Sequence, residues 1–228
     1  MLRTAVPLVL ALVAAPAAAA GWSVDEGSSV FAVLTRPAGA GAKLAHPHLV
    51  VARGVKTTLE FDGKSAESAR FTLSAPVLSL DVDPTAERKS LAARLETLGA
   101  HEGALPPIGD GDRKKIRKSM LEEGQLAAER FPAVRAELVA LERRGGGEGA
   151  RVALGWNARV RIEVRGKTVE KTFPARWELE GGELRAEVLG EAKFTEFGIE
   201  PYSAFLGAIR NADLFHFYVR IVARRTGD

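Results

Sequence analysis

The sequence predicts an all-β fold: a single antiparallel β-barrel of about eight strands with one helical insertion. Apolar and polar residues alternate over long stretches, which is typical of strands with one buried face and one solvent-exposed face. Glycine, proline or charged clusters bound each stretch, as turns do. Eight strands are enough to close a barrel. With 228 residues, 46% of them apolar, the chain can bury one substantial core, so we expect one domain.

Residues 1–20, MLRTAVPLVLALVAAPAAAA, have the layout of a cleavable secretory signal peptide. A single cation precedes an apolar run, and small residues lead up to Gly21. A membrane anchor is the alternative, but the run contains Pro7 and Pro16 and is short for a membrane span. The sequence therefore predicts an exported protein, periplasmic or secreted, whose barrel domain covers residues 21–228.

The composition excludes several classes of site. The chain has no cysteine, which removes disulfides, thiolate nucleophiles and cysteine-based zinc or iron–sulfur centres. The formal charge of +3 becomes +2 when Arg3 leaves with the signal peptide (3 minus 1), and the cations are interspersed with anions. A nucleic-acid partner is therefore not implied.

Eight strands are expected from the alternation. They cover about 29–35, 48–61, 69–82, 133–142, 151–165, 168–180, 183–194 and 213–225. The segments from 151 onward follow one another through short turns, which favours a meander. Gly190 marks a bend or a bulge in its strand. The last strand places His216 and Tyr218 on its polar face.

Residues 83–130 interrupt the alternation and predict a helical insertion lying over an end of the barrel. Asp83, followed by proline, is typical of a helix start, and leucines then recur at helical spacing. A second helix is expected from a cap at Asp112 to a stop at Gly124. The basic run 113–118 is interpreted as the solvated side of this helix, or alternatively as a contact with an anionic membrane surface.

The strands on either side of Gly166 form a hairpin whose register follows from its turn. If Gly166 and Lys167 are the two turn residues, the numbers of paired residues sum to 333. The directly opposite pairs are then Trp156 with Trp177, Ala158 with Ala175, and Val160 with Phe173. All six residues share the apolar face, where the small alanines would leave space beside the indoles.

Three stretches carry a family resemblance: LAHPHLVVARGVKTTLEFD (44–62), IRKSMLEEGQLAAERFPAVRAEL (116–138) and FTEFGIEPYSAFLGAIRNADLFHFYVRIVA (194–223). Together, and in this order, they resemble the YceI-like family of exported, lipocalin-like proteins that bind lipids and polyisoprenoids. The chain departs from the family in two places. One branch of the family has HDH where this chain has HPH, and the commonest short members carry an Asp and a His ahead of the second helix, whereas here three cations follow Asp112. The resemblance implies a lipocalin-like barrel with a long apolar chain threaded inside.

The resemblance makes the inward-facing side chains candidates for the wall of a lipid cavity. The candidate ligand-binding residues are Trp156, Ala158, Val160, Phe173, Ala175, Trp177, Phe194, Phe215 and Phe217, with His46 and His48 at the barrel mouth. From the residues alone, the aromatic side chains could instead be core filler, because any eight-stranded barrel needs side chains to fill it.

His46 and His48 are two residues apart, so on a strand both imidazoles would point to the same face. They could share a metal ion, line a barrel mouth, or be ordinary strand residues, and Pro47 between them favours an edge or a bulge. The segment 197–203, FGIEPYS, contains a carboxylate, a phenol and a hydroxyl, but no Gly-x-Ser-x-Gly elbow occurs and a structural corner is favoured. No catalytic residue and no metal ligand is assigned.

The sequence thus predicts a non-enzymatic exported protein, a carrier or sensor that holds a polyisoprenoid or isoprenoid-quinone chain in its barrel. No cofactor is expected apart from such a bound lipid or quinone. Transient contact with a membrane surface or a membrane redox protein fits this role. The alternatives are a metal-binding protein or hydrolase-like enzyme that uses His46 and His48, and an empty barrel that binds a partner.

Overall fold

The structure, a computed structural model, describes residues 21–144 and 155–226. The predicted signal peptide at 1–20 lies outside the described residues, as does the start of the predicted strand at 151–165. Among the described residues, no helix is both long enough and apolar enough to cross a membrane.

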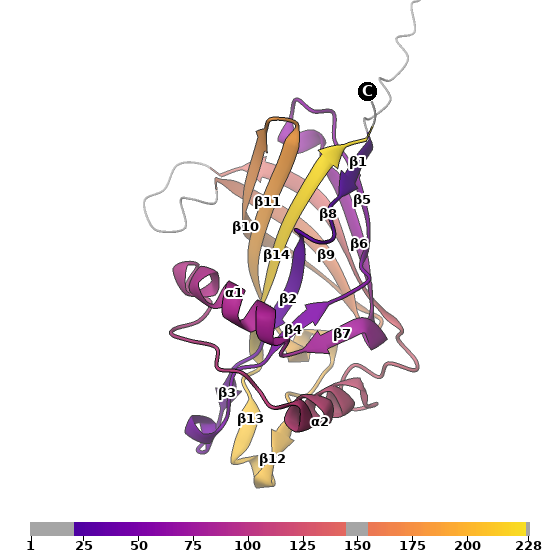
Figure 1. Cartoon of the computed structure of the whole chain (residues 1–228). Coiled ribbons are helices and arrows are strands. Elements are labelled where there is room, and N and C mark those ends of the chain that lie inside the picture. Colours follow the sequence, from indigo (N-terminus) through magenta and orange to yellow (C-terminus); the bar gives the residue numbers. More distant parts are fainter. Residues whose placement is uncertain (1–20, 145–154, 227–228) are drawn as a thin grey trace, which may run out of the picture.

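The described chain consists mostly of strands, with two α-helices between them (Figure 1). The strands before the helices are β1 (Gly21–Val24), β2 (Val30–Leu34), β3 (Pro37–Ala38), β4 (Leu49–Ala52), β5 (Lys56–Glu60), β6 (Arg70–Pro76) and β7 (Leu80–Val82). The helices are α1 (Thr85–Thr97) and α2 (Asp110–Leu121). The strands after them are β8 (Ala133–Arg143), β9 (Trp156–Val164), β10 (Lys167–Glu180), β11 (Glu183–Lys193), β12 (Ser203–Ala204), β13 (Ile209–Asn211) and β14 (Leu214–Arg225).

Within the described chain, eight strands close into an antiparallel barrel in the order β1, β5, β6, β8, β9, β10, β11 and β14. The ring closes because β14 pairs with β11 along one edge and with β1 along the other, where Trp22 lies opposite Arg225. The N-terminal half of β14 pairs with β2 instead, and the sheet continues from there to β4 and β7. The predicted class and the predicted number of barrel strands are confirmed.

Two of the predicted strands are interrupted in the structure. The stretch 48–61 forms β4 and β5, separated by Gly54 in the left-handed conformation at φ 57°. The stretch 69–82 forms β6 and β7, separated by a 3-10 turn at Val77–Ser79. At both interruptions the backbone leaves the extended conformation of a strand. As a result β5 pairs with β6 in the upper half of Figure 1, whereas β4 pairs with β7 in the lower half.

A second, three-stranded sheet of β12, β13 and β3 projects from the lower end of the barrel (Figure 1). The sequence predicts neither this sheet nor β1, because these strands have only two to four residues and show no detectable alternation. The corner expected near FGIEPYS is present, since a 3-10 turn at Phe194–Phe197 ends on Gly198 at φ 68°.

Helix α1 packs against the outer wall of the barrel. Its Leu91 and Leu95 lie in one buried cluster with side chains of β2, β4 and β14. These strand residues, Leu34, Leu49 and Tyr218, alternate with the residues that line the interior, so they lie on the outer face of the sheet. The prediction of an insertion over the barrel end is therefore wrong for α1. Helix α2 does lie at the lower end, below β7 in Figure 1.

Two residues of the predicted polar face of β14, His216 and Tyr218, are buried, and α1 packs against Tyr218. The Tyr218 hydroxyl donates a 2.7 Å hydrogen bond to Glu187 of β11, which also accepts hydrogen bonds from Arg94 of α1. Burial alone would raise the pKa of Glu187, but the hydrogen bonds from Arg94 and Tyr218 outweigh it and lower this pKa. Burial and the bond to Glu187 raise the pKa of Tyr218. His216 is also buried and pairs with Glu191 at 3.0 Å.

The helix starts differ from those predicted. Asp83 does not cap α1, because its buried carboxylate accepts hydrogen bonds from the Leu49 N–H and the Arg88 side chain rather than from the backbone N–H groups at the helix start. It also has a positive φ of 52°, which is uncommon for a residue with a side chain. Helix α2 begins at Asp110 rather than from a cap at Asp112, and it ends before Gly124.

The hairpin of β9 and β10 has a different register from the predicted one. The turn residues are Arg165 and Gly166, both left-handed with φ 53° and 70°, so Val164 pairs with Lys167. A two-residue turn of this type needs positive φ at both positions, and glycine takes the second. The observed pairs are Trp156 with Ala175, Ala158 with Phe173 and Val160 with Lys171, and none of the three predicted pairs forms. The residue numbers of each observed pair sum to 331 rather than 333. The register differs by two residues, an even number, so each side chain stays on the face of the strand where it was predicted.

Candidate functional site

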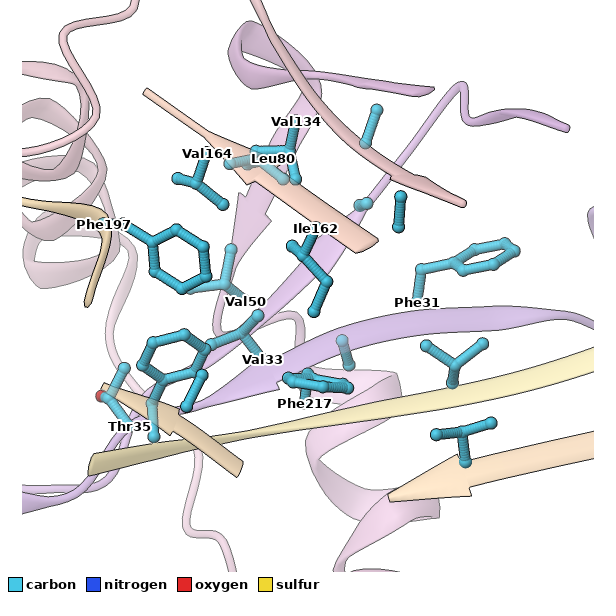
Figure 2. A pocket seen from close by; sticks show the side chains of 18 of the residues that line it. Phe31, Val33, Thr35, Val50, Leu80, Val134, Ile162, Val164, Phe197 and Phe217 are labelled. Carbon is cyan, nitrogen blue, oxygen red and sulfur yellow. The ribbon is translucent and has the colours of Figure 1, made fainter. Parts of the chain in front are cut away.

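The barrel encloses an apolar cavity of about 470 Å³, within the size range of pockets that bind small molecules. Its wall comes from inward-facing side chains of strands on all sides of the barrel. Figure 2 shows Phe31, Val33, Val50, Ile162 and Phe217 around this space, from β2, β4, β9 and β14. The interior is thus a hollow rather than a completely filled core.

Nine of the eleven predicted ligand-binding residues line this cavity: Ala158, Val160, Ala175, Trp177, Phe194, Phe215, Phe217, His46 and His48. Trp156 and Phe173 are buried in the wall outside the lining. Arg143 covers the Trp156 ring at 4.7 Å from its centre, and Phe173 packs edge-on against Phe217 with ring centres 4.6 Å apart. Alternation predicts the face of a strand but not the depth of each side chain, so it could not separate these two residues from the rest.

The upper end of the cavity is packed with aromatic side chains. The Phe61 ring lies 5.4 Å from that of Trp22 and meets the ring of Trp177 edge-on at 5.1 Å. The indole N–H of Trp22 donates a 3.1 Å hydrogen bond to the Phe61 carbonyl, which satisfies its polar group. Of these three, Trp177 alone lines the cavity. This end is therefore apolar.

Small residues in the wall leave the space that larger ones would fill. The lining alanines of the β8 to β11 wall are Ala136, Ala158, Ala175, Ala186 and Ala192. Gly190 acts differently, because a Cβ there would lie 2.1 Å from the Phe217 ring and 2.8 Å from that of Phe173. The pairing of β11 with β14 runs unbroken across Gly190, so the bend or bulge predicted there is not found in this pairing. The glycine instead admits an aromatic ring against the strand.

Most of the polar residues that line the cavity lie at its lower end. Lys115 and Ser119 come from α2, while Tyr202 and Arg210 come from the region of the small sheet. His46 is exposed at this end. The two ends of the cavity therefore differ, one apolar and aromatic, the other with hydroxyl, imidazole and cationic groups.

Helix α2 is held at this lower end by arginine side chains. Arg113 donates a 2.9 Å hydrogen bond to the Val82 carbonyl, and Arg117 donates one of 2.5 Å to the carbonyl of Leu78. The first bond reaches β7, the last strand of its sheet, and the second reaches the 3-10 turn just before it, while α2 has no buried residue of its own. The interpretation of 113–118 as a wholly solvated face is thus wrong for two of its cations.

His48 belongs to a hydrogen-bonded cluster at the cavity wall. Its Nδ1 lies 2.8 Å from Asp83, whose carboxylate also accepts hydrogen bonds from the Leu49 backbone, at 2.8 Å, and from Arg88. Asp83 and Arg88 are almost completely buried. Sequence reasoning missed both, because Asp83 resembles a helix cap and Arg88 resembles a surface cation of α1. The one available signal was the position of Arg88, three residues before Leu91, which places it on the same face of α1 as this buried leucine.

His46 and His48 do reach the same cavity, but the described residues contain no group of three His, Cys, Asp or Glu side chains that could hold a metal ion. The metal-binding alternative therefore lacks a third protein ligand in the part of the chain that the structure describes.

The sequence matches no protein-family model and no curated protein. Solved structures do resemble this one. BcnA of Burkholderia cenocepacia is 14% identical with a TM-score of 0.59, over 88% of this chain and 99% of BcnA. A YceI protein of Campylobacter jejuni is 9% identical with a TM-score of 0.53, over 78% of this chain and 85% of that one. A polyisoprenoid-binding domain from Saccharophagus degradans is 8% identical with a TM-score of 0.50, over 91% and 99%.

At these identities the likeness concerns the fold. It covers the closed eight-stranded barrel and most of the length of each neighbour. The resemblance first seen in three sequence stretches therefore extends to the whole architecture, and the chain has the fold of the YceI proteins.

Proposed function

We propose that this protein binds a long apolar lipid, a polyisoprenoid or the tail of an isoprenoid quinone, inside its barrel and acts as a carrier or sensor rather than an enzyme. The observation that carries the proposal is the apolar cavity with one aromatic end and one polar end. The structural neighbour from Saccharophagus degradans, a polyisoprenoid-binding domain, supports the same class of ligand.

Burial of hydrocarbon would supply most of the affinity. Each CH₂ group removed from water contributes about 0.8 kcal/mol, so a chain of several isoprene units needs few polar contacts. Alanine and branched aliphatic side chains offer no directional bonds, and selection would then depend mainly on the length and shape of the chain.

The first test uses Trp177, which lines the cavity whereas Trp22 and Trp156 do not. Titration with a C20 prenol or a long-tailed quinone should change the tryptophan emission saturably, and Trp177→Phe should abolish most of the change. Native mass spectrometry of detergent-free protein should show the lipid bound one to one. No saturable change with any long-chain lipid, together with no bound mass, contradicts the proposal.

Filling the cavity should weaken binding. Ala158→Phe places a ring in the space and should raise Kd by at least about tenfold, equivalent to about 1.4 kcal/mol. Thr172→Phe, on the exposed face of β10, is the matched control and should bind as wild type does. Unfolding of both variants in urea separates lost binding from lost stability, and normal binding by Ala158→Phe would contradict the role of this space.

Loading from an anionic membrane surface fits the lower end of the barrel. Leu44 is 81% exposed and Leu206 fully exposed, and both lie beside the small sheet, where the Gly41 N–H donates to the Ala208 carbonyl at 2.8 Å. Leu206 also has a strained φ of 55°. The cation Arg210 is exposed on the same sheet and lines the cavity, so anionic headgroups and an apolar cargo would meet at one place.

This contact is tested with vesicles of phosphatidylcholine that contain phosphatidylglycerol. Co-sedimentation of wild type should fall several-fold in Leu44→Ser/Leu206→Ser, whereas Leu179→Ser, an exposed leucine beside the Gly181 turn, should leave it unchanged. Equal sedimentation of all three proteins would leave a protein partner, such as a membrane redox protein, as the receptor of this end.

Export remains part of the proposal. Residues 1–20 support it through their signal-peptide pattern. Mass spectrometry of the protein recovered from the periplasm or medium of its native host should give a mature chain that starts near Gly21, and an uncleaved chain in the cytoplasm would contradict it.

A further inference from the structure

The His48 side chain has one nitrogen committed to the protein and one available to a ligand. Its Nδ1 lies 2.8 Å from Asp83 Oδ2. The carboxylate already accepts hydrogen bonds from the Leu49 N–H and from Arg88, so it acts as an acceptor throughout. Nδ1 must then be the donor, and in a neutral imidazole this places the lone pair on Nε2.

A buried ion pair of Arg88 and Asp83 holds the His48 side chain in place. Arg88 and Asp83 balance each other, and Arg88 is held further by the Pro47 carbonyl at 2.9 Å and the Pro106 carbonyl at 2.8 Å. The cluster therefore fixes both the orientation and the tautomer of His48.

His48 lies on the interior face of the barrel. The Thr35 N–H donates a 2.9 Å hydrogen bond to the His48 carbonyl, and the pairing of Val33 with Val50 continues to these two residues, so Thr35 and His48 point to the same side. Both line the cavity, and Figure 2 shows Thr35 at its edge close to Val33. The His48 side chain is partly exposed, and its Nε2 has no hydrogen-bond partner among the described residues.

We propose that Nε2 of His48 accepts a hydrogen bond from a hydroxyl group at the polar end of the bound lipid. The ligand class is then a long-chain alcohol or a hydroquinone, because Nε2 as an acceptor forms no hydrogen bond with a ligand end that only accepts. This inference rests on the proposed lipid-binding function and adds the chemistry that selects the headgroup. Asp83 and Arg88 act as positioning residues, because they hold His48 and do not touch the ligand.

The test compares three ligands with the same chain: a C20 prenol, its methyl ether and its monophosphate. Each is titrated against wild-type protein with Trp177 emission as the signal. The prenol should bind about tenfold more tightly than the ether, which cannot donate a hydrogen bond to Nε2. His48→Phe should remove this preference while it keeps binding of both ligands, and His101→Phe, at a half-buried loop histidine that does not line the cavity, should leave the preference intact.

Each outcome separates the headgroup site from the carrier function. If none of the three ligands binds, the carrier function fails. If prenol and ether bind wild type equally, the carrier function stands and the His48 site is overturned. If the monophosphate binds best and the advantage is lost in Lys115→Met/Arg210→Met, the polar end recognises an anion instead, which also overturns the His48 site.

A ligand-free measurement provides a second test that does not depend on the folding of a variant. The ¹⁵N NMR shifts of the histidine ring in wild-type protein at neutral pH should show His48 as the tautomer protonated on Nδ1. The opposite tautomer, or an imidazole protonated on both nitrogens, would contradict the proposal.

Discussion

At Gly190 the missing side chain is what allows the Phe217 ring to lie against β11. Gly190→Ala would put a Cβ 2.1 Å from that ring, so the ring or the strand must move. We expect a loss of about 1–3 kcal/mol in the free energy of unfolding, as for other overpacked cores. Gly111→Ala is the control, because nothing lies within 4 Å of its added Cβ and it sits in α2. Urea unfolding measures both, and equal stability of the two variants would show that Phe217 moves aside freely.

Glu187 predicts a specific dependence of stability on pH. Its pKa is lowered in the folded protein, so its contribution is complete above the unfolded value of about 4.3 and is lost as the pH falls through the folded pKa. Glu187→Gln should therefore be less stable than wild type at pH 7, by about 1 kcal/mol or more, because Arg94 and Tyr218 lose a charged acceptor.

The difference between the two proteins should shrink as the pH falls toward 3. Chemical unfolding at a series of pH values measures it, and Glu180→Gln, at an exposed glutamate with no ion pair among the described residues, is the control. A difference that stays constant from pH 7 to pH 3 would show that Glu187 stabilises α1 by packing alone.

Single residues were the least predictable part of the chain. Asp83 stands before a proline and a helix, which is the local pattern of a cap, yet its carboxylate binds Leu49 and His48. Arg88 looks like one more cation on a helix but is 1% exposed. The partners of both are remote in sequence, so no local pattern contains them. His46 and His48 both line the cavity, although neither lies in a strand as the shared-face argument assumed, and the role of His48 depends on such remote partners.

At the scale of elements, α2 is held by bonds to β7 and to the turn just before it rather than by an apolar face. Arg113→Met with Arg117→Met should remove its hydrogen bonds to the carbonyls of Val82 and Leu78. We expect amide exchange in residues 110–121 to become at least about tenfold faster, since each lost bond is worth roughly 1 kcal/mol.

Lys114→Met with Lys118→Met is the matched control, because neither lysine has a hydrogen bond or ion pair among the described residues. Hydrogen exchange followed by mass spectrometry measures both double variants. Unchanged exchange after loss of the arginines would mean that Ile116 and Met120 hold the helix instead.

Alternation predicted the faces of the elements well and their continuity poorly. The inward-facing residues of β9, β10, β11 and β14 follow the predicted parity, because a strand has a period of two wherever it lies. The hairpin register was wrong by one turn position, since Arg165 rather than Lys167 takes the left-handed conformation beside Gly166. The breaks at Gly54 and Val77–Ser79 were missed because apolar residues continue through them.

The whole molecule combines a fold that sequence pattern could predict with a cavity that it could not. Barrel class follows from the alternating segments, whereas the predicted count of eight included β2, which lies outside the ring, and missed β1, which is part of it. The volume depends on how far each side chain reaches inward, which is why Trp156 and Phe173 lie in the wall while Trp177 reaches the cavity. The lower end, with its polar lining, comes from the short strands of the small sheet and from α2, and therefore from the parts with the weakest sequence signal.

Strand β14 is the last strand of the chain, yet it has three neighbours, β11, β1 and β2. Closing the ring brings Trp22 and Val24 beside Arg225 and Ala223, contacts between opposite ends of the sequence that form slowly because a long loop must close. Until β14 docks, three strand edges are unpaired and the hollow interior is open to water, which invites association between chains. A closed barrel around a hollow therefore cannot form until β14 has been synthesised and has paired with its three neighbours.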